Sequence, residues 1–146
     1  MTKDVLVSVA GLQTAVNEME NYDEEPIEVL SAGTYYFKDG KHFIFFEEMA
    51  EGIPGVTKTQ IRLNGRESLE VRKKGIANVN MVFETGKKTV TYYNTPFGNL
   101  LIGIYTTNIQ ITEKEEGLLV AIRYSLEMNY EHISDCTITI KVIDRV

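Results

Sequence analysis

The chain has 146 residues, a formal net charge of −6, and 43% hydrophobic and 25% charged residues. This length suits one domain with a substantial core, and the composition excludes wholesale disorder. The acidic balance argues against a nucleic-acid-binding protein, because neutralising phosphates requires a cationic surface. We therefore expect a single domain over residues 1–146 that binds no nucleic acid.

The N-terminal segment and the cysteine content indicate a cytoplasmic protein. Met1 to Asp4 lead directly into a short apolar strand pattern and lack the apolar run of a signal peptide. No stretch approaches the ~18 apolar residues of a membrane-spanning helix, so we expect no membrane insertion. The single cysteine, Cys136, cannot form a disulfide within the chain, which fits a reducing compartment.

Turn signals recur along the whole chain, and the runs between them are rich in Val, Ile, Thr, Tyr and Phe, which favour strands. No segment shows sustained helical periodicity, and the best helical candidate, from Leu12 to Met19, is short. The turn signals lie at residues 39–40, 52–55, 64–65, 73–75, 86–88, 94–98 and 114–117.

A two-residue turn at 39–40 predicts a hairpin that is apolar on both faces. Its expected cross-strand pairs are Tyr36 with Phe43, Tyr35 with Ile44, and Phe37 with His42. An apolar face needs cover. We expect the core to cover one face, and the N-terminal segment or another subunit to cover the other.

The turn at 64–65 predicts a second hairpin, for which a two-residue loop would bring apolar and polar residues onto one face. A three-residue loop with a bulge instead pairs Ile61 with Leu69 and Thr59 with Val71, and we prefer it.

Two later segments alternate apolar and polar residues with the period of a strand. Ala77, Val79, Met81 and Phe83 share one face of the first segment, and alternate residues from Leu118 to Met128 form a longer stripe. Eight to ten such strands with short antiparallel connections predict an all-β fold, a closed or nearly closed barrel. A two-sheet sandwich remains the alternative.

Three of the short motifs in the chain are Val71-Arg72-Lys73-Lys74-Gly75, Met81-Val82-Phe83-Glu84-Thr85-Gly86 and Tyr93-Asn94-Thr95-Pro96-Phe97-Gly98. These motifs resemble those of the YwiB-like family of small bacterial proteins of unknown function. The resemblance runs from about Ser31 to the C-terminus and implies a calycin-like barrel related to the lipocalins. It carries no catalytic residues and no ligand onto this chain, and fold alone does not fix function.

Motifs that could carry metal or phosphate chemistry have simpler interpretations. The run Gly86-Lys87-Lys88-Thr89 lacks the spacing and the helix of a phosphate-binding loop, so we interpret it as a turn. On a strand, His132 and Cys136 would lie ~13 Å apart, too far to share one metal ion. We expect no metal, no cofactor and no catalytic residues, and an enzyme ranks third among the functional hypotheses.

An inward arginine among aromatic side chains would bind the acidic head of an apolar-tailed ligand. The parity of the strands favours solvent-facing arginines, and the aromatic residues also suit plain core packing. The candidate ligand-binding residues are Arg72, Phe83, Tyr93, Tyr105, Arg123 and Tyr124.

Two hypotheses therefore lead. In the first, the barrel binds one small hydrophobic or amphipathic molecule in its lumen. In the second, the lumen is packed and the protein is a non-enzymatic interaction module, with a homodimer or partner interface on the hairpin from Tyr35 to Phe46.

Overall fold

The computed structural model describes residues 2–15, 27–49, 54–76, 78–96 and 98–145. These residues form ten β-strands and no helix, so none of them builds a membrane-spanning helix. The strands are β1 (Lys3–Ala15), β2 (Ile27–Lys38), β3 (Lys41–Glu48), β4 (Thr57–Asn64), β5 (Ser68–Gly75), β6 (Val79–Glu84), β7 (Lys88–Thr95), β8 (Gly98–Lys114), β9 (Gly117–Met128) and β10 (Glu131–Asp144).

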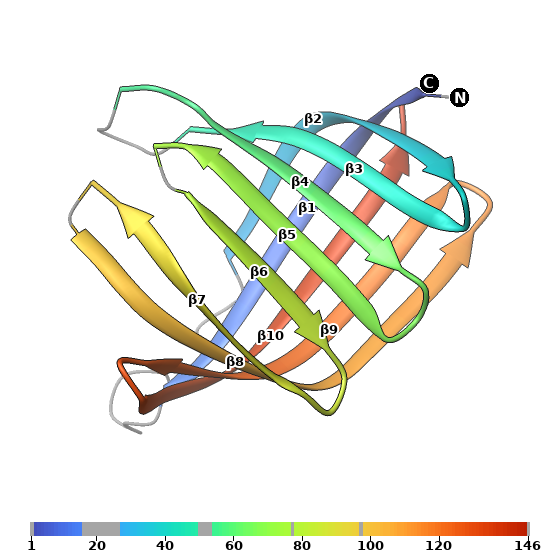
Figure 1. Ribbon diagram of the computed structural model, residues 1–146. Coiled ribbons are helices and arrows are strands. Elements are labelled where there is room, and N and C mark those ends of the chain that lie inside the picture. Colours follow the sequence, from blue (N-terminus) through green and yellow to red (C-terminus); the bar gives the residue numbers. More distant parts are fainter. Residues whose placement is uncertain (1, 16–26, 50–53, 77, 97, 146) are drawn as a thin grey trace.

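The strands form one antiparallel sheet in the order β6-β5-β4-β3-β2-β1-β10-β9-β8-β7. The sheet curls so that its two end strands, β6 and β7, approach each other and nearly close a barrel (Figure 1). Asn78 and Asn94 join the two ends through a pair of backbone hydrogen bonds, each 2.9 Å from N to O. The predicted all-β barrel is thus confirmed.

The β2–β3 hairpin has the predicted register. Tyr36 pairs with Phe43, and the neighbouring pairs follow from it. The turn residues Asp39 and Gly40 have φ angles of 53° and 76°, which the two-residue turn of a twisted hairpin requires. A short turn of one type fixes the register, so the sequence was sufficient here.

The β4–β5 hairpin differs from the prediction in its register. Ile61 lies opposite Val71, and Leu63 lies opposite Leu69, so the expected pairing of Ile61 with Leu69 is wrong. The connecting loop has three residues as expected, but these are 65–67 rather than 64–66, and a loop displaced by one residue moves the pairing by two positions. A register shift of two residues keeps each side chain on the same face of the sheet. The apolar residues of both strands therefore still point into the core, as expected.

The lumen is filled by apolar side chains from nearly every strand. The interior residues of β6 and β9 behave as the alternation predicts, with Val79, Phe83, Val120 and Ile122 buried and Met81 half-buried. Ala77 and residues 16–19 of the weak helical candidate lie outside the described residues, whereas 12–15 belong to β1. The largest side chains with under 2% exposure are Phe83, Ile44, Leu63, Leu69, Ile104, Ile122 and Ile140.

Candidate binding site

The structure separates the predicted ligand-binding residues into an inner and an outer group. Phe83, Tyr93 and Tyr124 face the lumen and pack in the core, while the other three residues of the set lie on the outer surface of the barrel. The outer three are Arg72 on β5, Tyr105 on β8 and Arg123 on β9. The six residues therefore form no common site.

The inner group serves packing. The rings of Phe83 and Tyr124 meet edge to face with centroids 5.1 Å apart. Burial of Tyr124, followed by its proximity to the thiol of Cys136, raises the pKa of this phenol above its ordinary range. Tyr124 thus stays neutral and polar within an apolar lumen.

A groove of about 500 Å³ lies on the outer face of β2, β3, β4 and β5, and we call it the outer groove. Its volume falls within the range of small-molecule sites. Its lining residues are Ala32, Gly33, Thr34, Phe45, Phe46, Glu47, Lys58, Thr59, Gln60, Arg72 and Lys74.

Strand alternation explains the apolar wall of the groove. Phe45 points outward because its neighbours Ile44 and Phe46 are buried in the core. The ring of Phe45 stacks on Tyr36, with centroids 5.7 Å apart, and gives the groove an apolar wall. Gly33 runs so close to β3 that a Cβ atom there would collide with the carbonyl oxygen of Phe45, so the close approach of these strands requires glycine at this position.

A second hollow, of about 360 Å³, opens at the end of the barrel where β3 begins and β8 ends, and we call it the mouth pocket. The Tyr35 hydroxyl lies 2.6 Å from His42 Nδ1, and His42 Nε2 lies 3.1 Å from a carboxylate oxygen of Glu113. Across the pocket, the Lys3 ammonium lies 3.0 Å from Asp144.

This phenol–imidazole–carboxylate row has a consistent proton arrangement in which Tyr35 donates to His42, and His42 donates to Glu113. Burial, then the charges of Glu113 and Asp144, raise the pKa of Tyr35. The phenol therefore remains a hydrogen-bond donor at neutral pH rather than a nucleophile. Such a row ties β2, β3 and β8 together at the mouth.

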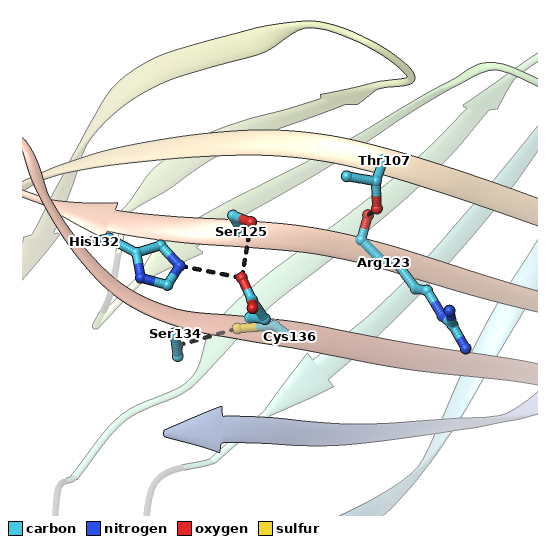
Figure 2. Close-up of polar contacts among 7 residues, drawn as sticks. Thr107, Arg123, Ser125, His132, Ser134 and Cys136 are labelled. Carbon is cyan, nitrogen blue, oxygen red and sulfur yellow. Dashed lines mark hydrogen bonds and ion pairs between the residues drawn. The ribbon is translucent and has the colours of Figure 1, made fainter. Parts of the chain in front are cut away.

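The outer face of β8, β9 and β10 carries the second histidine (Figure 2). Ser125 donates to Asp135 Oδ1 at 2.9 Å, and His132 Nε2 lies 3.1 Å from the same oxygen. These two contacts lower the pKa of Asp135. The Asp135 carboxylate lies between Ser125 and His132, so the imidazole makes no hydrogen bond to the hydroxyl. A nucleophile–base pair requires that bond.

Cys136 lies apart from this group. It is buried on the lumen side, where its Sγ lies 3.4 Å from the Ser134 hydroxyl, whereas His132 is exposed (Figure 2). Within the described ranges, no three His, Cys, Asp or Glu side chains gather as metal ligands would. Gly86 and Lys87 lie in the predicted turn between β6 and β7, whereas Lys88 and Thr89 already belong to β7.

Sequence reasoning found one wall residue of the outer groove, Arg72, and missed Lys58 and Lys74. Their common place follows from the β4–β5 register, in which Lys58 lies directly opposite Lys74. The register error described above concealed this pair. Glu113 was also missed, because 71 residues separate it from His42 and no local pattern links them.

Comparisons with known proteins agree with the fold. A family model described as "Domain of unknown function (DUF1934)" matches residues 12–140. The chain is 32% identical over 119 residues to the "Uncharacterized beta-barrel protein YwiB" of Bacillus subtilis (strain 168), which covers 80% of this chain and 82% of that protein. The crystal structure of the ywiB protein from Bacillus subtilis matches with a TM-score of 0.76 at 24% identity, covering 96% of this chain and 92% of that one.

Proposed function

Because this chain belongs to the DUF1934 family, which is described only as a domain of unknown function, we propose its function from its own surface. It is a binding protein without catalysis of its own. One small amphipathic molecule binds in the outer groove rather than in the barrel lumen.

The observation that carries this proposal is an apolar, concave site outside a packed barrel. Ile104, Val120 and Phe83 fill the lumen, each at no more than 1% exposure. The outer groove has room for a ligand and an aromatic wall at Phe45. Apolar clefts with a few polar groups are the usual form of small-molecule sites.

The test uses the neutral fluorophore N-phenyl-1-naphthylamine, whose emission rises in apolar surroundings. We expect saturable binding to the wild-type chain and none to the Ala32→Tyr variant, in which an exposed strand residue of the groove is enlarged. Thr112→Tyr is the matched control, because Thr112 is an exposed strand residue on β8, away from the groove lining.

The control should bind the fluorophore like the wild-type chain. Equal binding by the Ala32→Tyr variant, or no binding by the wild-type chain, would contradict the proposal. Circular dichroism of both variants verifies that the barrel is intact.

A second candidate function is self-association through the β2–β3 hairpin. Tyr36 stacks between Phe43 and Phe45 on the outer face, with centroids 4.7 and 5.7 Å apart. These rings form an aromatic surface that favours a homodimer.

Sedimentation at several concentrations tests this second function. We expect a dimer that dissociates to monomers in the Tyr36→Glu variant, because a carboxylate at the centre of this surface would be buried without a partner. A wild-type chain that stays monomeric at every concentration rules the candidate out.

We also propose a cytoplasmic location. The supporting observation is that the single cysteine, Cys136, is a buried free thiol. Thiols of this kind persist in reducing compartments.

A further inference from the structure

We infer that the ligand of the outer groove is an amphipathic oxyanion, whose acidic head group lies between Lys58 and Lys74 while its apolar part contacts Phe45. This inference rests on the proposed function and adds the charge of the ligand to it. The residues that carry it are the cations of the groove wall.

The register of β4 and β5 brings the two lysines together. Lys58 is the direct cross-strand partner of Lys74, and both side chains point outward and are exposed. Directly opposed residues have Cβ atoms about 5 Å apart, and like charges in this arrangement destabilise a sheet. An anion bound between the two ammonium groups reverses that repulsion.

A third cation extends the same cluster. Arg72 lies two residues before Lys74 on β5 and therefore points to the same face. Its guanidinium is 3.6 Å from Glu70, but that carboxylate is already shared with Arg62 at 3.2 Å. One carboxylate between two guanidinium groups leaves positive charge uncompensated at this wall.

The described surroundings supply little negative charge to the lysines. Among the described residues, Glu47 is the one carboxylate in the groove lining, and it lies opposite Lys58 in the β3–β4 register. Neither Lys58 nor Lys74 makes a hydrogen bond or ion pair with the described residues, Glu47 included. By contrast, their neighbour Lys73, on the lumen side, is paired with Glu48 at 3.3 Å.

The described residues of the groove wall thus carry three cations against one carboxylate, in a chain with a net charge of −6. This local excess opposes the charge of the whole molecule and adjoins an apolar wall. A site with one cationic end and one apolar wall is complementary to an amphipathic oxyanion such as a carboxylate or a sulfonate.

The test compares two probes that share one scaffold. N-Phenyl-1-naphthylamine is neutral, and 8-anilinonaphthalene-1-sulfonate is the same scaffold with a sulfonate. We expect the wild-type chain to bind the sulfonate at least about tenfold more tightly than the neutral probe, as hydrogen bonds to charged groups allow. In the Lys58→Gln/Lys74→Gln variant this preference should vanish, while the neutral probe binds as before.

The matched control is the Arg123→Gln/Lys141→Gln variant, which removes two exposed outward cations from β9 and β10. It should keep the full preference for the sulfonate. Equal binding of both probes by the wild-type chain, or a preference that survives in the lysine variant, overturns the inference.

The two proposals fail in different ways. Binding of the neutral probe without preference for the sulfonate leaves the groove function standing and refutes the anionic ligand. If the chain binds the sulfonate in a lysine-dependent way but does not bind the neutral probe, the anion site is supported and the apolar groove is refuted.

Discussion

At the residue scale, Phe83 is the largest described side chain with under 2% exposure. It is 1% exposed and meets Tyr124 edge to face. Phe83→Ala should lower the free energy of unfolding by about 3–5 kcal/mol, because the truncation leaves a cavity that close-packed neighbours do not fill. Urea unfolding measures the change.

Phe37→Ala is the control for this substitution, since Phe37 is 53% exposed. Its effect should stay within about 0.5 kcal/mol, as surface substitutions generally do. A neutral result for Phe83→Ala would mean that the lumen is not packed around this ring.

Tyr124 makes the stability of the barrel sensitive to alkali. Burial raises the pKa of its phenol in the folded state above the ordinary value of 10.0. As pH rises past about 10, the unfolded chain loses this proton first, so the unfolded state is favoured and the free energy of unfolding falls. Below that pH the stabilisation is fully present.

The Tyr124→Phe variant should therefore show a shallower loss of stability between about pH 9 and 11, because it has no buried phenol to ionise. Tyr92→Phe, at a position 65% exposed, serves as the control and should follow the wild-type curve. Denaturant unfolding at several pH values gives the slopes, and identical slopes for all three chains would refute the role of Tyr124.

At the element scale, the β6–β7 seam is the weakest junction of the barrel. Among the described residues, the seam contains the backbone bonds of Asn78, just before β6, with Asn94 and, between these and the turn, one side-chain bond from Thr89 Oγ1 to the Val82 carbonyl at 2.6 Å. Since N–H groups alternate along a strand, Tyr92 directs its N–H to the seam, as Asn94 does, and Tyr93 directs its N–H to β8.

Hydrogen exchange followed by NMR should therefore separate neighbouring amides on β7. We expect the Tyr92 amide to exchange much faster than the Tyr93 amide, because only the latter lies in a ladder. Equal protection of the two amides would indicate a fully bonded, closed barrel.

The β2–β3 and β4–β5 hairpins show how far the sequence could predict the structure. The register of the β2–β3 hairpin followed from a two-residue turn, whereas the longer loop after Asn64 left the β4–β5 register open. Alternation correctly placed Arg72 and Arg123 outside. It failed for Tyr105, which was expected to suit packing inside the barrel but is 44% exposed on the outer surface, because its neighbours Ile104 and Thr106 take the inward positions. The pairing of Lys58 with Lys74 required the register itself.

At the scale of the whole molecule, spacing of turns and strand composition predicted a barrel, and the family resemblance agreed with it. Neither source predicted that β6 and β7 would be the two edge strands that meet to close the barrel. That junction has few hydrogen bonds among the described residues, and no local sequence pattern marks it. The outer groove was equally inaccessible to sequence reasoning. It arises from four strands, and concavity depends on how the sheet coils.

The most direct test of the central claim is to locate the bound ligand. Amide NMR spectra of the labelled protein would be recorded during titration with 8-anilinonaphthalene-1-sulfonate. We predict shifts concentrated at Ala32, Thr34 and Lys58 in the outer groove. Shifts centred instead on lumen residues such as Ile104 and Val120, with the groove unaffected, would contradict a site outside the barrel.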